Sequence, residues 1–237
     1  MIDLSFIKSI AHRCLVAEIY DEAVQDGEII GLLLQGSVAR GENYQTSDID
    51  FYVLLEDGLN RPLCSEYRGN ILVEMKYADF ERAVYKCKSS SMGLYNFLDS
   101  IILFDYRRKF SQIKELANNV LEQYEVPKSE VKSIVYWLET ALIKIEAARE
   151  ADDELKAAFV VATTSWKILE GLWAVNSKPV PPNGLVFYHL KKLKRVPENV
   201  DEEIKLLFTG DTTQRIETAI RIIEWTISCL NRLSRSA

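Results

Sequence analysis

The segment GSVARGENYQTSDID, from Gly36 to Asp50, lies between two apolar runs and decides the fold of the chain around it. Residues 29–34 precede it and residues 51–55 follow it, and both runs are short and rich in strand-forming side chains. The pattern predicts a strand, a tight turn with a short helix, and a second strand that carries two carboxylates. Because side chains alternate along a strand, we expect Asp48 and Asp50 on one face.

The residue types in this segment suit phosphate chemistry. Two carboxylates on one face are hard oxygen ligands of the kind that Mg²⁺ prefers, and they leave positions for substrate phosphates. Gly36 and Ser37 lie where a strand gives way to a helix, and free backbone N–H groups at such a point bind anions. A phosphate cradle beside a metal-binding pair predicts phosphoryl or nucleotidyl transfer. The structural alternative is a plain turn and a solvated Asp-x-Asp pair, which the spacing and the flanking strands disfavour.

A Gly-Ser pair, ten further residues and Asp-x-Asp between two strands resemble the signature of the DNA polymerase β-type nucleotidyltransferase superfamily. Residues 36–54 are most similar to its small bacterial branch, which includes the aminoglycoside and lincosamide nucleotidyltransferases and the minimal nucleotidyltransferases of toxin–antitoxin pairs. The motif covers residues 36–50, and the order of the surrounding elements extends the match toward residue 125. The resemblance implies a small mixed sheet flanked by helices, a bound nucleoside triphosphate, two Mg²⁺ ions and a third carboxylate on a neighbouring strand.

Glu74 is our candidate for the third carboxylate. It is the only acid in segment 71–77, which alternates like a strand and follows a Gly-Asn turn. An ionised carboxylate on a half-buried strand is unfavourable unless it is paired or bound to metal. The alternative is a glutamate on an edge strand that faces water. Many relatives have Asp at the third position, so Glu74 departs from the pattern.

Further residues are candidates for binding the triphosphate. Arg40 and Ser47 lie inside the motif and would assist Gly36 and Ser37.

The C-terminal half has a weaker resemblance. Residues 141–153 resemble the helical hairpin of the kanamycin nucleotidyltransferase arrangement, in which helices complete the acceptor pocket. Lys144 in this segment is our candidate for a triphosphate contact, and a surface lysine is the alternative. No spacing singles out a general base among Glu139, Glu146 and Glu170. Four aromatic residues at helical intervals are expected in the core rather than in a base-stacking platform: Tyr136, Trp137, Trp166 and Trp173.

The order of predicted elements indicates an α+β protein, with a small mixed-sheet nucleotidyltransferase core (residues 1–125) followed by an all-α helical-bundle domain (residues 126–237). In the first part we expect strands near 29–35, 48–55, 63–68, 70–77 and 99–105 and helices near 4–24, 79–88 and 109–123. A Val-Pro-Lys-Ser segment then restarts the pattern. After it we expect helices near 129–150, 153–176, 183–194, 199–209 and 211–234.

Composition excludes several classes of protein. The hydrophobic content of 48% and charged content of 27% are typical of a globular protein. No apolar window has the length of a membrane span and the N-terminus lacks the features of a signal peptide, which predicts a cytoplasmic location without a membrane partner. The net charge of −6, concentrated in residues 1–125, disfavours long nucleic acids. The 4 scattered cysteines and 2 histidines predict neither a disulfide framework nor a zinc site.

These patterns together predict a Mg²⁺-dependent enzyme that moves a nucleoside monophosphate, with AMP favoured, from a nucleoside triphosphate to a hydroxyl of a small molecule. Asp48 and Asp50 would hold two Mg²⁺ ions, and Glu74 would share one of them. The acidic first half favours a cationic acceptor such as an aminosugar. The alternative is a module, similar to the minimal nucleotidyltransferases, that nucleotidylates or binds a partner protein. The acceptor, the nucleobase and the oligomeric state, a homodimer included, are left open.

Overall fold

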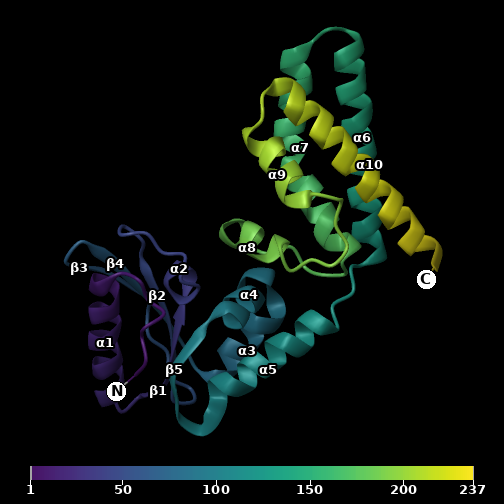
Figure 1. Cartoon of the computed structure of the whole chain (residues 1–237). Coiled ribbons are helices and arrows are strands. Elements are labelled where there is room, and N and C mark those ends of the chain that lie inside the picture. Colours follow the sequence, from purple (N-terminus) through teal and green to yellow (C-terminus); the bar gives the residue numbers. More distant parts are fainter. Residues whose placement is uncertain (1, 237) are drawn as a thin grey trace. The chain divides into compact units, whose positions relative to one another are not determined.

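The computed structural model describes residues 2–236 and divides the chain into two compact units, one ending at Gln123 and the other beginning at Tyr124 (Figure 1). The first unit is built on a five-stranded sheet, and the elements described in the second unit are helices. The protein is therefore of the α+β class, as the sequence predicted. Within the described residues, no helix combines the length and the apolar character that a bilayer crossing needs.

The sheet is mixed. Its strands lie in the order β3-β4-β2-β1-β5, and β2 runs parallel to β4 while the other neighbouring pairs are antiparallel. Because β2 and β4 are parallel, the chain between them must return to the end of the sheet at which β2 begins. The connection from β2 to β4 includes the edge strand β3. The strands span β1 (Ile29–Gln35), β2 (Ile49–Leu55), β3 (Cys64–Arg68), β4 (Ile71–Ala78) and β5 (Ile101–Asp105).

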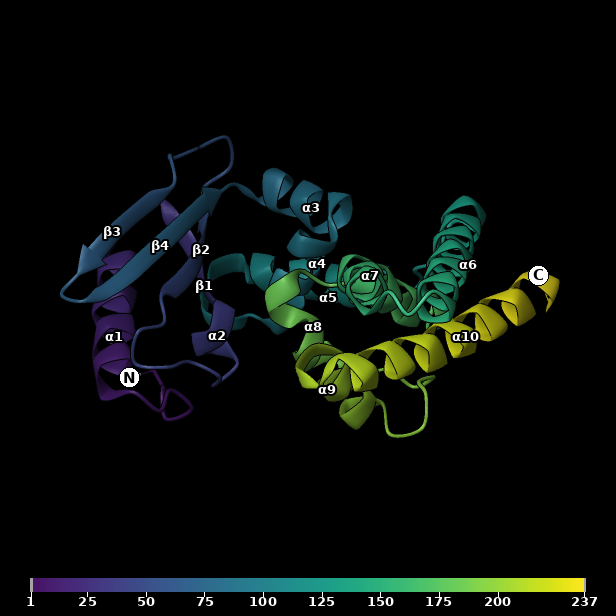
Figure 2. The same ribbon diagram turned by 90° about the horizontal axis from the view of Figure 1, so that it is seen from above.

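Helices cover both faces of the sheet (Figure 2). One face packs against α1 (Ile10–Gln25), and the other packs against α3 (Phe80–Ser89), α4 (Ser91–Asp99) and α5 (Lys109–Glu122). Residues of β2 alternate between the two cores, because successive side chains of a strand point to opposite faces. A single turn of helix, α2 (Gly36–Ala39), joins β1 to the segment before β2.

Two boundaries in this unit differ from the sequence prediction. The first helix begins at Ile10 rather than near residue 4, because the Ser9 side chain caps it by accepting a hydrogen bond from the His12 N–H. Helix α4 was not predicted at all. The Ser90 side chain caps this helix by accepting a hydrogen bond from the Gly93 N–H at 3.0 Å. Because the helix extends to Asp99, β5 starts at Ile101 rather than at residue 99.

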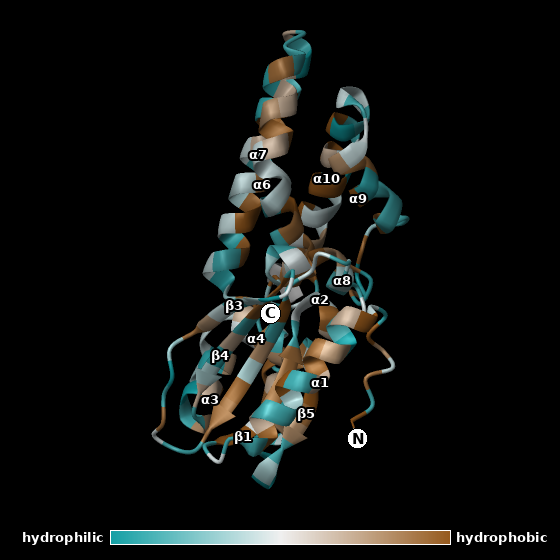
Figure 3. Cartoon of the chain, turned by 90° about the vertical axis from the view of Figure 1, so that its left-hand side faces the viewer, coloured by the Kyte–Doolittle hydropathy of each residue, from teal (hydrophilic) through white to brown (hydrophobic). Residues whose placement is uncertain are grey.

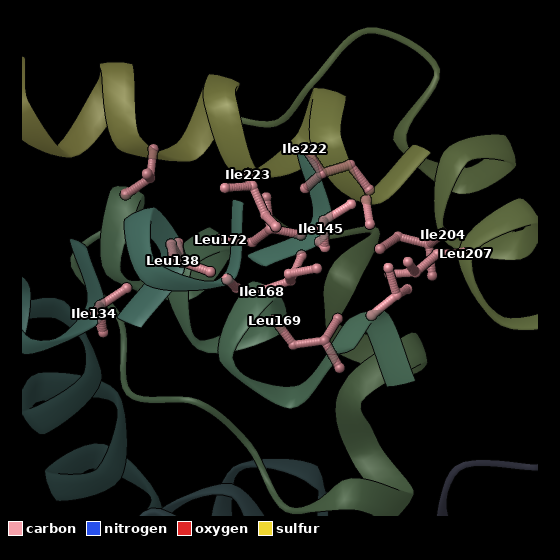
Figure 4. Close-up of a cluster of buried hydrophobic side chains, with 14 of the residues drawn as sticks. Ile134, Leu138, Ile145, Ile168, Leu169, Leu172, Ile204, Leu207, Ile222 and Ile223 are labelled. Atoms are coloured by element: carbon pink, nitrogen blue, oxygen red, sulfur yellow. The ribbon is translucent and has the colours of Figure 1, made fainter. Parts of the chain in front are cut away.

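The helical unit has its own apolar core. Its elements are α6 (Lys128–Glu150), α7 (Glu154–Val175), a 3₁₀ turn (Asn183–Leu185), α8 (Val186–Leu190), α9 (Val200–Thr209) and α10 (Thr212–Ser236). Aliphatic side chains from α6, α7, α9 and α10 meet in one cluster (Figure 4). Along α6 and α7 these apolar residues alternate with polar ones, whereas β1 and β5 of the first unit are apolar along most of their length (Figure 3). The long helix expected over 183–194 is reduced to the 3₁₀ turn and α8.

The aromatic residues of this unit do not all lie in the core. Trp173 is buried and Trp166 packs partly buried against the core. Tyr136 and Trp137 are 62% and 52% exposed, so their predicted core position was wrong. Helical spacing alone did not distinguish the inner from the outer face of α6, because apolar residues occur on both.

Candidate active site

The turn between β1 and α2 requires glycine. Gly36 has a φ of +72°, in the left-handed region that L-residues with a side chain avoid. A Cβ at this position would lie 2.5 Å from Oδ2 of Asp50. Gln35 and Asp50 are cross-strand partners in the antiparallel pair of β1 and β2, which explains this proximity. The Gly-Ser turn is therefore packed directly against one of the motif carboxylates.

Asp50 and Glu74 lie side by side. They are directly paired in the parallel register of β2 and β4, and their side chains are 20% and 28% exposed. Because β4 lies between β3 and β2, Glu74 is not on an edge strand, which removes the alternative considered for it. Two half-buried carboxylates in direct register repel each other unless a cation lies between them.

A lysine supplies that cation. The Nζ atom of Lys76 lies 2.9 Å from Oδ1 of Asp50 and 3.4 Å from Oε2 of Glu74. Burial disfavours the ammonium form, but the hydrogen bond to Asp50 and the two carboxylate charges outweigh it, and the pKa of Lys76 is raised. A second lysine, Lys86 on α3, holds its Nζ 5.3 Å from the centre of the Tyr52 ring. Burial, and then the charge of Lys76, lower the pKa of Lys86.

Asp48 lies just before β2 and is exposed. Partial burial of its carboxyl and the charge of Asp50, with a smaller contribution from Glu74, raise the pKa of Asp48. The three carboxylates are thus close enough to interact electrostatically. Among residues 2–236 the structure nevertheless shows no ready-formed cluster of three or more His, Cys, Asp or Glu side chains arranged for a metal ion. The shared metal site stays a prediction.

The loop in front of Asp48 is tied to α1 by a buried histidine. The Nε2 of His12 lies 2.9 Å from the carbonyl oxygen of Ser47, and its Nδ1 lies 2.8 Å from the Ser9 hydroxyl. Because a carbonyl oxygen only accepts, we assign the ring proton to Nε2, which leaves Nδ1 to accept from Ser9. The Ser47 hydroxyl in turn accepts from the Tyr44 N–H at 2.9 Å.

The remaining candidate residues from the sequence lie in the turn after β1 or in the second unit. Arg40 pairs with Glu42 at 2.8 Å, and the Ser37 carbonyl accepts from the Glu42 N–H, so both residues take part in the structure of the turn. Lys144 belongs to the second unit and is exposed on α6.

Of the three possible bases, Glu139 and Glu146 are exposed on α6, and Glu170 forms an ion pair with Lys167. None of them is singled out by a contact that would mark a base.

Sequence reasoning missed His12 and Lys76. Lys76 could have been found, because it follows Glu74 by two residues in an alternating strand and therefore faces the same way. His12 carries no such signal, since its partner Ser47 is 35 residues distant along the chain.

The donor set fits a divalent cation. Carboxylate oxygens are the ligands that Mg²⁺ takes in proteins. The space between Asp50 and Glu74 already holds a positive group, the ammonium of Lys76, so this position favours positive charge. Asp48, Asp50 and Glu74 are the residues that would hold the ions.

The Gly36 turn packs against Asp50, and Asp50 is paired with Glu74 on the adjacent strand, as expected from the resemblance to the nucleotidyltransferases. Residues 16–136, just over half of the chain, match the family described as nucleotidyltransferase domain. The protein belongs to this family.

The other comparisons add little. No curated protein gives a sequence match to the chain. Among solved structures, the chain is similar to a nucleotidyltransferase-like protein from Exiguobacterium sibiricum 255-15, with 12% identity and a TM-score of 0.42 over 90% of this chain and 73% of that one. At this level the likeness carries no argument about function.

Proposed function

We propose that this protein transfers a nucleoside monophosphate, with AMP the preferred group, from a nucleoside triphosphate to a hydroxyl of a small acceptor. Membership of the nucleotidyltransferase family supports the general reaction. The observation that carries the proposal is the direct pairing of Asp50 and Glu74 beside the Gly36 turn. Residues 1–125 would form the nucleotidyltransferase domain, and residues 126–237 would form a helical domain.

The reaction forms one bond and breaks one. The acceptor oxygen bonds to the α-phosphorus, the bond from that phosphorus to the oxygen bridging the β-phosphate breaks, and pyrophosphate leaves. The hydroxyl proton passes to water or to a base. Asp48 and Asp50 would hold two Mg²⁺ ions and Glu74 one of them; when bound, these ions would lower the pKa of the attacking hydroxyl and neutralise the leaving pyrophosphate.

The chain's other residues would bind and orient the triphosphate. Gly36 lets the phosphates approach the backbone closely, because no Cβ stands between them and the turn. Ser37 would contact the same phosphates, with Arg40, Ser47 and Lys144 as further contacts. His12 would hold the Ser47 backbone, and with it the position of Asp48, through its hydrogen bond to the Ser47 carbonyl.

The acceptor is proposed to be a small hydroxylated cation. The net charge of the whole chain is −6, and three carboxylates belong to the proposed site. Such a field attracts an aminosugar and repels a sugar phosphate. Transfer to a cationic acceptor is therefore expected to slow as salt concentration rises, because salt screens the attraction.

The test is to incubate the protein with each α-³²P-labelled nucleoside triphosphate, Mg²⁺ and a panel of cationic, neutral and anionic hydroxyl compounds. We expect label from ATP on a cationic acceptor. The Glu74→Gln variant is the control for contaminating activity, and the exposed Glu115→Gln variant controls for the loss of one acid. If no acceptor takes label and the wild type forms no pyrophosphate, the proposal fails.

The alternative acceptor is a protein. Large apolar side chains are exposed on the helical unit, and such side chains mark a protein-binding surface where they form one patch. They are Tyr136, Trp137, Ile143, Leu155, Phe159, Phe187 and Phe208. Label that goes only onto a co-purified protein, with no small molecule accepting it, would favour this alternative.

A further inference from the structure

Lys76 is placed where the proposed metal ions would need to be. Asp50 and Glu74 are directly paired across β2 and β4, and Lys76 follows Glu74 by two residues on the same face of β4. Its ammonium contacts one oxygen of each carboxylate, at 2.9 and 3.4 Å. The side chain is 32% exposed and has an open path to solvent.

The contacts of Lys76 with Asp50 and Glu74 compensate the charge that the register of β2 and β4 brings together. Without a cation, the paired carboxylates would repel each other in a half-buried site. Lys76 neutralises one of the two negative charges and hydrogen-bonds to the more buried partner, Asp50. Removing one partner of such an arrangement leaves charge uncompensated, so the contact stabilises the unit before any metal binds.

The same contact opposes metal binding. A divalent ion coordinated by Asp50 and Glu74 would share their oxygens with the ammonium and would be repelled by it at close range. Lys86, which lies on the same side of the sheet, adds positive charge but holds its Nζ over the Tyr52 ring. Of these two lysines, we expect Lys76 to compete with the metal ion, because its ammonium contacts the carboxylate oxygens that would bind the ion.

We propose that Lys76 is a built-in counter-cation, which occupies the position between Asp50 and Glu74 in the metal-free protein and leaves it when a divalent ion binds. The inference rests on the proposed function, because it takes Asp50 and Glu74 as metal ligands. Its consequence is a site that is stable when empty and that binds divalent ions more weakly than its carboxylates alone would.

The experiment measures binding of Mn²⁺ alone, by electron paramagnetic resonance of the free ion, to the full chain. Lys76→Gln removes the competing charge, Lys76→Arg retains it, and Lys86→Gln removes an equal charge that does not contact the carboxylates. We expect Mn²⁺ to bind Lys76→Gln about tenfold more tightly than wild type, an effect between those of exposed and of buried ion pairs. The other two variants should stay within about threefold of wild type.

Thermal unfolding gives a second readout that needs no activity. Metal-free Lys76→Gln should melt below wild type, and added Mn²⁺ should raise its melting temperature more than that of wild type, because the ion replaces the lost positive charge. An affinity in Lys76→Gln equal to or weaker than that of wild type would overturn the inference and leave the proposed function standing. If wild type and Lys76→Gln both bind no Mn²⁺, the metal site of the proposed function fails with it.

Discussion

The two units of this protein differ in how they bring charged side chains together. In the sheet unit, the half-buried side chains of Asp50, Glu74 and Lys76 are drawn together by strand register. In the helical unit, the partly buried pair of Lys167 and Glu170 joins neighbouring turns of one helix, and the candidate Lys144 is exposed on α6. Because the first unit gathers two carboxylates and an ammonium on adjacent strands, its own structure supports a role in chemistry. The role of the second unit rests on resemblance.

The largest expected effect tests whether the sheet unit carries the chemistry. Asp50→Asn should lower nucleotidyl transfer by at least about a thousandfold, because it removes a charged ligand from the reacting centre. The variant should stay folded, with an unchanged far-ultraviolet circular dichroism spectrum. The exposed Glu115→Gln on α5 is the matched control and should keep its rate. Activity of Asp50→Asn within tenfold of wild type would exclude Asp50 as a metal ligand.

The next effect concerns the core of the helical unit. Leu172 on α7 is fully buried, and Leu172→Ala should lower the free energy of unfolding by about 2–5 kcal/mol through the lost packing and the cavity left behind. Leu155→Ala, at a highly exposed position of the same helix, should change it by less than about 0.5 kcal/mol. Chemical denaturation measures both. Equal effects at the two positions would mean that the packing of α7 is wrong.

A smaller effect is expected at the turn. Gly36→Val should weaken binding of ATP with Mg²⁺ by about tenfold, since a strained backbone of this kind is worth roughly 1–3 kcal/mol and the new side chain meets Oδ2 of Asp50. Gly27→Val is the control, because Gly27 has open space around its Cβ position. Isothermal titration calorimetry compares the two, and unchanged affinity in Gly36→Val would remove the turn from the site.

The smallest effect is a pH-dependent change in stability at Asp48. Its pKa is raised in the folded protein above the ordinary value of 3.8, so its ionisation opposes folding once the pH exceeds that value. Metal-free Asp48→Asn should therefore melt slightly above wild type at pH 7. The difference should shrink as the pH falls and disappear below 3.8, where the wild-type carboxyl becomes protonated in both states. A variant that melts below wild type at pH 7 would contradict the raised pKa.

Local patterns predicted most of the sheet unit. The apolar runs on each side of Gly36–Asp50 became β1 and β2, and the alternating segment around Glu74 became β4. Helix α4 escaped prediction because a run of serines at 89–91 offered several possible starts, and only the hydrogen bond from Gly93 selects Ser90. In the helical unit, apolar residues on more than one face of α6 hid the inner face, which only contact with α7 and α10 defines.

The sequence by itself determined the strand–turn–strand motif and the α+β class and selected three candidate acids, because these depend on spacing and alternation along a few residues. Only the tertiary structure decided that Asp50 is paired with Glu74, that Lys76 lies between them, and that His12 holds the loop before Asp48. Strand register and helix packing bring together residues that are 24 to 35 positions apart, and no local pattern specifies such a pairing.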